Sequence, residues 1–290
     1  MDTNNLIDKI LKANKLGDVI ELKDWKKKYQ SILMHIHPDK CKHIKAGEAL
    51  SKLVELKDQY EIGTNYYDDI GEYTTNGHQA IFSGDQKKLL KSKCLFDTIS
   101  KLQDPASKHF RKCLPKTMVM DDGKLKIEFE QRSIPLSGLQ LPQEHVNWVL
   151  SRILEFTAWF HQIGYAHCGL NPESIFIVPE THGIIVTSFY HTVKLDGKLE
   201  SGSGKYAHWY TPSAFASKIA IPTIDLECAK KTAIYLLGDP SGSGVKLRKT
   251  HHTAFLDFVI AQHHDAYQCF DEYRKLIDKH FEKKFHSLTL

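Results

Sequence analysis

The sequence lacks several features that would place a chain in a common class. Its 290 residues contain no run of about 20 apolar residues, the length that a helix needs to cross a bilayer. The first residues, MDTNNLIDK, are polar and do not resemble a secretory signal. The six cysteines are scattered without a Cys-x-x-Cys pair, which argues against a disulfide framework and against a zinc site. We therefore expect a cytoplasmic protein with reduced cysteines and no membrane partner.

Metal-binding and nucleic-acid-binding signatures are missing as well. Histidine is abundant, but adjacent residues such as His251-His252 and His263-His264 point to different faces of a helix. No His-Glu-x-x-His spacing accompanies them, so we expect neither a metal site nor a cofactor. Basic residues are dispersed and the net charge is only +4, so composition does not indicate a nucleic acid partner.

The first 62 residues have helical periodicity. Apolar residues recur there at three- and four-residue steps, which indicates one apolar face on each of three helices. Pro38 separates the two longer patterns, because a proline lacks the N–H donor and the residue before it avoids the helical region. The patterns consist of Leu6, Ile7, Ile10 and Leu11, then Leu22, Trp25, Tyr29, Ile32, Leu33 and Ile36, and then Ala46, Ala49, Leu50, Leu53, Leu56 and Tyr60.

His37-Pro38-Asp39 forms the predicted turn of this antiparallel helical hairpin, after a helix that carries Lys26, Lys27 and Lys28. In this context the tripeptide resembles the J domain, the module by which co-chaperones engage a DnaK-type (heat shock protein 70) chaperone and trigger its ATPase. The resemblance implies that His37, Pro38 and Asp39 act at the chaperone's interdomain linker and that the three lysines meet an acidic surface. The alternative is an ordinary turn beside a solvated basic face.

Residues 64 to 135 have the texture of strands and turns. Asn76-Gly77 and Asp122-Gly123 each lie between strand-forming segments, which is a strong hairpin signal. The segment from Cys94 to Leu102 reads as a helix between the two hairpins. From Pro142 onward a strongly periodic segment predicts a buried helix of about five turns.

The segment after that helix, WFHQIGYAHCGLNPESIFIVPETHGIIVTSFY, resembles the catalytic-loop region of the protein-kinase fold. Asp225 matches the buried aspartate that ties down the catalytic loop in that family. The match covers about residues 140 to 285, and the preceding lobe is a weaker match. The residues that match the scaffold of the loop are His161, Gly164, His167, Leu170, Pro172, Glu173, Ile175 and Ile177.

The chemistry of the kinase family is not retained at these positions. Gly169 replaces the proton-accepting aspartate, and Asn171 replaces the phosphate-contacting lysine. Ser174 and Ser188 replace the two metal ligands. Lys91 is the best candidate for the strand lysine, although no glutamate follows it in the next helix, and GEYTTNG between the first strands is not a glycine-rich phosphate loop. Phosphoryl transfer needs these groups together, so the resemblance implies a pseudokinase.

We therefore expect an α+β protein with a J domain at 1–64 and a bilobal kinase-like domain at 70–290, split into a small β-rich lobe (70–135) and a helical lobe (136–290). The expected function is that of a co-chaperone that brings a DnaK-type chaperone to an unknown protein client. Two alternatives remain open. One is a divergent nucleotide-dependent transferase that uses Glu173, Asp196 or Asp225 for metal, and the other is an interaction protein that stimulates no chaperone.

Overall fold

The structure is a computed structural model that describes residues 3–21, 25–282, 284 and 286–290. The chain is a mixed α+β protein that divides into two compact units. Unit 1 comprises the residues up to Asn65 together with Thr74–Asn76, and unit 2 comprises Tyr66–Tyr73 together with Gly77–Leu290. Across the described residues, no helix combines the length and apolar character that spanning a bilayer requires.

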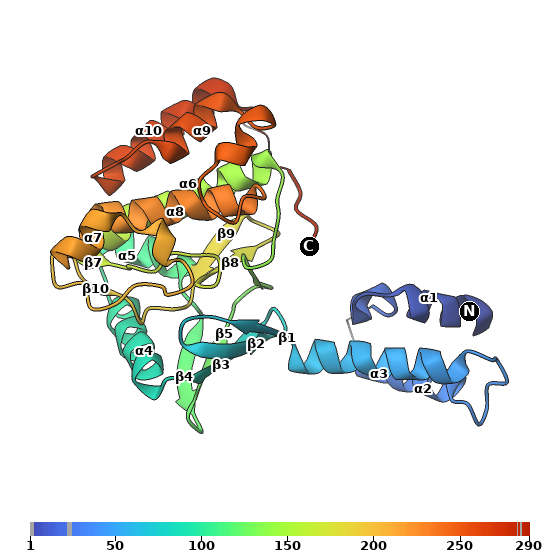
Figure 1. Ribbon diagram of the computed structural model, residues 1–290. Helices are drawn as coiled ribbons and strands as arrows, with labels where there is room; N and C mark the ends of the chain where they lie inside the picture. The colour runs from blue at the N-terminus through green and yellow to red at the C-terminus, as the bar shows by residue number, and fades with distance from the viewer. Residues whose placement is uncertain (1–2, 22–24, 283, 285) are drawn as a thin grey trace. The chain divides into compact units, whose positions relative to one another are not determined.

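Unit 1 is built from three helices, α1 (Thr3–Lys12), α2 (Trp25–Ile36) and α3 (Ala46–Ile62), with a short 3-10 turn, η1 (Leu16–Asp18) (Figure 1). The expected helices are confirmed in this unit. Their buried faces form one core. Trp25 at the start of α2 and Tyr60 near the end of α3 pack against this core with their ring centres 5.3 Å apart, so the two helices run antiparallel. Leu22 and Lys23, which the sequence placed at the start of α2, lie outside the described residues. The core consists of Leu6, Ile7, Ile10, Ala13, Leu16, Val19, Ile20, Tyr29, Ile36, Ala49, Leu53 and Leu56.

The larger sheet has five strands in the order β1-β2-β3-β5-β4. The strand bounds are β1 (Thr64–Tyr67), β2 (Gly71–Thr75), β3 (Gln79–Gly84), β4 (Thr117–Asp121) and β5 (Lys124–Glu128). The hairpin predicted at Asp122-Gly123 is confirmed: β4 and β5 pair antiparallel, and both turn residues adopt the positive φ that a tight hairpin requires. The hairpin predicted at Asn76-Gly77 is confirmed as well, since β2 and β3 flank these residues and are neighbours in the sheet. The segment GEYTTNG, which was expected between the first strands, is mostly strand β2, and the first connection is Asp68–Ile70.

Helix α4 (Gln86–Ser100) begins before the expected Cys94. The Asp85 side chain accepts hydrogen bonds from the backbone N–H groups of Lys87 and Lys88, which satisfies two donors of the first turn and starts the helix there. The interpretation of Lys91 as a strand lysine was therefore wrong, since Lys91 lies on α4. Helix α5 (Pro105–Phe110) and a 3-10 turn, η2 (Arg111–Cys113), lead into β4.

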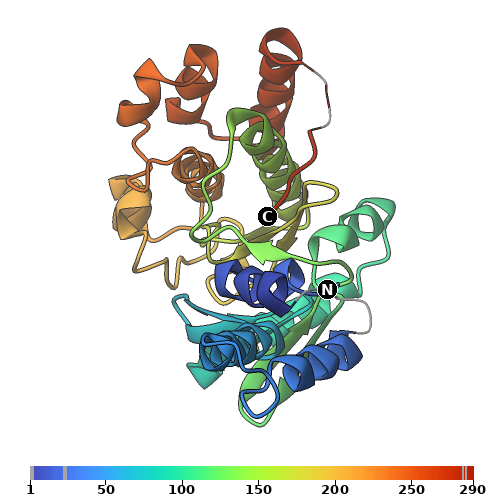
Figure 2. The ribbon, with the colours of Figure 1, turned by 90° about the vertical axis from the view of Figure 1, so that its right-hand side faces the viewer.

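The rest of unit 2 is mainly helical. Helix α6 is the predicted five-turn helix, and it lies beside both α8 and α10 (Figures 1 and 2). The strands of this part form a small sheet in the order β6-β8-β9 and a separate pair, β7-β10. The bounds are α6 (Gln143–Gln162), α7 (Pro212–Ser217), α8 (Pro222–Leu236), α9 (Thr253–Ile260), α10 (Ala266–His280), β6 (Ile134–Pro135), β7 (Tyr165–Ala166), β8 (Ile175–Val178), β9 (Gly183–Val186), β10 (Val193–Lys194), η3 (Ala207–Trp209) and η4 (Val245–Lys249).

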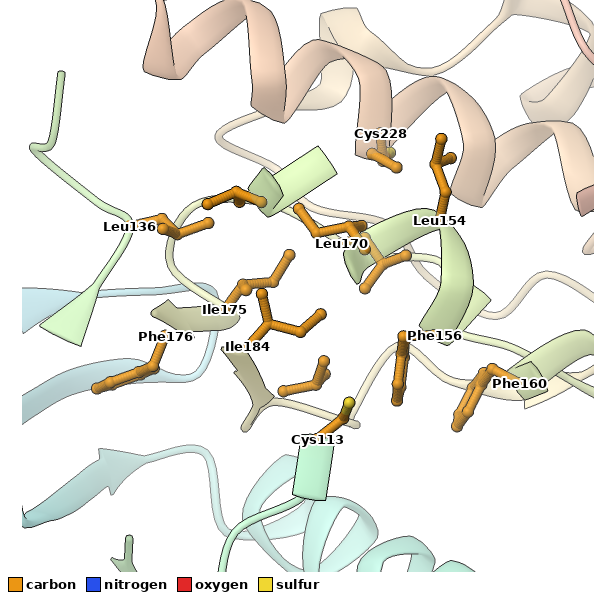
Figure 3. Close-up of a cluster of buried hydrophobic side chains, with 14 of the residues drawn as sticks. Cys113, Leu136, Leu154, Phe156, Phe160, Leu170, Ile175, Phe176, Ile184 and Cys228 are labelled. Carbon is orange, nitrogen blue, oxygen red and sulfur yellow. The ribbon is translucent and has the colours of Figure 1, made fainter. Parts of the chain in front are cut away.

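One apolar core joins these elements in unit 2. Figure 3 shows Phe156 and Phe160 of α6 facing Leu170, Ile175 and Ile184 from the loop and strands that follow. All five side chains are fully or almost fully buried. The loop at residues 167–174 is thus held by apolar packing of Leu170 within it and of Ile175 directly after it.

Candidate functional sites

The His-Pro-Asp turn follows α2 directly. The backbone N–H groups of Lys40 and Cys41 both donate to the His37 carbonyl oxygen at 2.9 Å, which closes the turn. The Asp39 N–H donates to Nδ1 of His37 at 3.3 Å. The Asp39 side chain remains 86% exposed and that of His37 43% exposed, and Pro38 is exposed as well. The turn is held by backbone bonds while its side chains face solvent.

The lysines on α2 differ in how much of their charge is available. Lys26 and Lys27 are exposed, and the Lys26 ammonium lies 5.8 Å from the centre of the Trp25 ring. Lys28 is less available, because its Nζ lies 2.6 Å from Oε2 of Glu21. This hydrogen bond and the charge of Lys28 lower the pKa of the Glu21 carboxyl. A binding partner would therefore meet two exposed cations, on Lys26 and Lys27, and a third that is shared with Glu21.

Two exposed apolar side chains lie close in sequence to the turn, and sequence reasoning missed both. Ile44, between the turn and α3, is 95% exposed, and Met34, near the end of α2, is 58% exposed. Single exposed apolar residues are common on protein surfaces. Neither residue belongs to a periodic pattern, so periodicity carried no signal for them.

In unit 2, Asp225 of α8 holds the loop that follows β7. Its carboxylate accepts hydrogen bonds from the backbone N–H groups of His167 and Cys168, both at 2.7 Å, and lies 2.8 Å from Nε2 of His161. Burial alone would raise the pKa of this carboxyl, but the hydrogen bond and charge of His161 outweigh burial and lower it. Cys168 needs this support because it adopts a positive φ of 57°. The role inferred for Asp225 from sequence matches the contacts that it makes.

His167 is a core residue. Its ring packs against Phe160 and Phe189, with centroid distances of 6.0 and 5.7 Å, and its pKa is lowered to about 4 because it is fully buried. Neither ring nitrogen has a hydrogen-bond partner among the described residues. A neutral histidine in this position can fill space but cannot carry a charge near neutral pH.

The space beside Gly169, where a side chain would lie, is filled by His191. A Cβ atom added at Gly169 would lie 2.8 Å from Cδ2 of His191, closer than side chains approach one another. Nδ1 of His191 lies 2.7 Å from Oγ of Ser201, and its Nε2 lies 3.3 Å from Oδ2 of Asp69. The imidazole therefore occupies the place where a carboxylate on residue 169 would have to stand.

The other polar positions of the loop are occupied by internal hydrogen bonds. Oδ1 of Asn171 accepts from the backbone N–H groups of Glu173 and Ser174, at 3.0 and 3.1 Å. The Ser174 hydroxyl donates to the Gly169 carbonyl oxygen at 2.8 Å. Ser188, in contrast, donates its hydroxyl to Oδ2 of Asp68 from the β1–β2 turn, at 3.1 Å. Asn171 and Ser174 thus stabilise the loop itself, whereas Ser188 joins its segment to the β1–β2 turn.

Asp68 and Asp69 were also missed by sequence reasoning. Burial raises the pKa of Asp68 to about 6, against the lowering effect of hydrogen bonds from the backbone of Ile70 and Gly71 and from Ser188. Burial would raise the pKa of Asp69 too, but hydrogen bonds from its neighbours, chiefly His191, bring it below the ordinary value. Two carboxylates from one turn thus lie against Ser188 and against His191, the residue that packs over Gly169. The only sequence signal for these residues was that two adjacent aspartates lie between strand-forming segments.

The other charged residues that the sequence singled out do not form a site together. Lys91 pairs with Glu200 at 2.7 Å, and Glu173 is buried and accepts from Tyr206 at 2.8 Å and from Lys205. Asp196 lies in an exposed turn after β10. In the part of the chain that the structure describes, no three His, Cys, Asp or Glu side chains gather where they could hold a metal ion.

Comparison with known proteins adds no identification. No protein-family model matches the chain, and no curated protein matches it in sequence.

Proposed function

We propose that this chain is a co-chaperone whose unit 1 acts as a J domain on a DnaK-type chaperone, and whose unit 2 is a kinase-like, non-catalytic domain that binds a protein partner. The observation that carries the proposal is the exposed His37-Pro38-Asp39 turn at the end of an antiparallel hairpin. The turn leaves its ionisable side chains open to a partner, and the exposed Lys26 and Lys27 on the preceding helix supply charge that speeds encounter with an acidic surface.

Support for a non-catalytic role of unit 2 comes from the contacts of its loop. Phosphoryl transfer needs carboxylates on magnesium and a positioned base. The base position is Gly169, which is blocked by His191, and the ligand positions Ser174 and Ser188 are hydrogen-bonded within the protein. Strand β3 before α4 contains no lysine, and its Phe82 is buried against Tyr73 with ring centroids 4.5 Å apart.

Negative charge is a further argument against a bound nucleotide in unit 2. Asp68 and Asp69 lie against Ser188 and His191, where the kinase resemblance would put the triphosphate and its metal. A phosphate entering there would meet these two carboxylates, and the ammonium of Lys88 is already bound to the Asp69 carbonyl oxygen at 2.6 Å. The remaining function for this domain is to bind a protein partner on its surface. Two binding modules on one chain raise the local concentration of chaperone at the partner.

The test of the J-domain assignment is the steady-state ATPase rate of a DnaK-type chaperone with the full chain and its variants. His37→Gln should abolish stimulation. The matched control is His43→Gln, because His43 lies in the same connection and its Nδ1 accepts a backbone N–H at 3.1 Å, as that of His37 does at 3.3 Å. Equal stimulation by the wild type and His37→Gln would refute the assignment.

Thermal unfolding with and without magnesium-ATP distinguishes this proposal from the competing function, a nucleotide-dependent transferase. A ligand at about 100 times its dissociation constant adds about 2.7 kcal/mol to the free energy of unfolding. We expect no such shift in the melting temperature of the full chain. A clear upward shift, or transfer of labelled phosphate from ATP, would favour the enzyme.

A further inference from the structure

Two buried histidines of unit 2 are joined by a hydrogen bond. Nδ1 of His145, near the start of α6, lies 2.7 Å from Nε2 of His182 in the turn between β8 and β9. The two residues are 7% and 0% exposed, and their rings stack with centres 5.0 Å apart. His182 adopts a positive φ of 51°, an uncommon backbone conformation that this contact helps to hold. The proposed function gives the pair no role.

The bond between the two imidazoles depends on how many protons they carry. One ring donates its N–H, and the other accepts it on an unprotonated nitrogen. A first added proton places a charge in a buried site, where desolvation opposes it. If both rings are protonated, two N–H groups face each other across 2.7 Å and the bond is lost. Acid therefore weakens this contact.

The surroundings of the pair also disfavour added protons. Burial lowers the pKa of His145, against the raising effect of Glu144, and the charge of His286 lowers it further. Burial lowers the pKa of His182 as well, followed by the charges of His145, His286 and Arg152. A lowered pKa favours the neutral ring in the fold, so this contribution to stability is present above about pH 6.5 and is lost as the pH falls through the lowered values. The other charged groups at the nearby cavity wall are two of each sign: Arg274, Lys284, Asp278 and Glu282.

Residues 286–290, which we call the tail, lie against the same part of unit 2. His286, Leu288 and Leu290 are half-buried, and the two residues between them are exposed. The two leucines pack against the core of the unit. The His286 ring meets the His145 ring edge-on, with centres 6.3 Å apart. His145 thus contacts its partner in the pair and the first residue of the tail.

We propose that the His145–His182 pair is a pH-sensitive switch that holds the tail on unit 2 while the pair is bonded and releases it when both rings are protonated. Loss of the bond lets the His145 ring move away from His182, and His286 packs against that ring. His286 also lines a cavity of about 260 Å³ together with Trp148 and Phe281. Release of the tail therefore exposes these two aromatic side chains to solvent in acid.

The experiment is hydrogen–deuterium exchange of the full chain at about pH 7.5 and about pH 5, read by mass spectrometry on peptides that contain the tail. Each rate is divided by the intrinsic rate at that pH. His145→Gln/His182→Asn removes both titrating rings, and asparagine suits the positive φ at 182. His286→Gln removes the ring of the tail, and His208→Gln is the control, because His208 is exposed on η3. Melting curves at both pH values confirm that each variant folds, and His145→Gln alone replaces the double variant if the latter does not.

In the wild type we expect the tail to lose about tenfold or more of its protection at the lower pH, since one unit of pKa shift is a tenfold change in an equilibrium constant. Helix α6 should keep its protection. The double variant should show no dependence on pH, whatever its level of protection, and His145→Gln alone should show less than the wild type. His208→Gln and His286→Gln should keep the dependence.

Three outcomes would overturn the inference. The first is equal protection of the wild-type tail at both pH values. The second is a dependence on pH in the pair variants as large as in the wild type, or one that only His286→Gln removes, which would place the switch on His286. The third is an equal loss of protection in α6, which would mean that acid unfolds the whole unit.

Discussion

The His-Pro-Asp turn of unit 1 and the loop at residues 167–174 of unit 2 are both short, polar connections between elements, but their side chains are used differently. In the turn, backbone bonds hold the chain and Asp39 remains 86% exposed. In the loop, His167, Asn171 and Ser174 are at most 3% exposed, and the latter two bond to the loop backbone. An exposed polar group is available to a partner, whereas a buried one is committed to the fold. Substitutions should therefore change activity in the first case and stability in the second.

The largest effect on stability should follow Asp225→Ala. The substitution leaves two buried backbone N–H groups and the His161 ring without their acceptor, and we expect the free energy of unfolding to fall by about 3–5 kcal/mol. Urea unfolding measures it. Asp271→Ala is the control, since Asp271 forms an exposed ion pair with Lys275 on α10 and should cost less than about 1 kcal/mol. Similar losses in both variants would mean that Asp225 does not anchor the loop.

The next effect depends on pH and has opposite signs at two adjacent residues. The pKa of Asp68 is raised from 3.8 to about 6, so its proton stabilises the fold below about pH 4, and this contribution is lost as the pH rises through 6. Asp68→Asn should thus gain as much as about 3 kcal/mol relative to the wild type between pH 4 and 7.5. The pKa of Asp69 is lowered, so its contribution is present above 3.8 and lost on acidification. Relative to the wild type, Asp69→Asn should therefore lose stability as the pH rises to about 4 and change little between pH 4 and 7.5.

These two aspartate variants serve as controls for each other. Both substitutions remove one charge from the same turn, so a general effect of net charge would move both in the same direction. Urea unfolding of each at several pH values separates the outcomes. Parallel curves would show that Asp68 is not destabilised by burial.

A smaller loss should follow Gly169→Asp. The new side chain meets the His191 ring, and overpacking of this kind costs about 1–3 kcal/mol. Because the clash is with one residue, Gly169→Asp combined with His191→Ala should be less destabilised than the sum of the two single variants. A double-mutant cycle by urea unfolding measures this coupling. Strict additivity would show that the two side chains do not compete for one space.

The smallest effect on stability should be that of His37→Gln. The side chain contributes one long hydrogen bond and an exposed contact with the Asp39 carboxylate at 3.4 Å, and the backbone bonds to its carbonyl oxygen remain, so we expect a change of less than about 0.5 kcal/mol. Thermal unfolding checks it. A drop of several degrees together with lost chaperone stimulation would mean that the turn holds the hairpin together, and the contrast between the two regions would disappear.

Elements with strong local signals were predictable from the sequence. The periodic apolar face of α6 predicted a helix that the structure confirms at Gln143–Gln162, and Asp122-Gly123 predicted the β4–β5 hairpin. Asp85 was an available helix-start signal for α4, but the lysines after it were taken for part of a strand. A helix cap depends only on hydrogen bonds between neighbouring residues, so a capping residue predicts a helix start more reliably than a resemblance predicts the position of one lysine.

The contacts that define the loop of unit 2 could not be predicted in this way. Asp68 meets Ser188, and Asp69 meets His191, across about 120 residues of chain. Such pairs depend on how two distant segments fold together, and neither segment has a pattern that names its partner. The glycine at position 169 was visible in the sequence, whereas the residue that fills the space beside it was not.

The position of His191 over Gly169 also constrains how the chain can evolve. An aspartate at 169 is tolerated only after residue 191 has become smaller, and that first step breaks the hydrogen bonds of the imidazole to Asp69 and Ser201 before anything is gained. Each of the two single substitutions is costly, so a route to an acid at residue 169 passes through a less stable protein whichever step comes first. The packing of one imidazole sets that barrier.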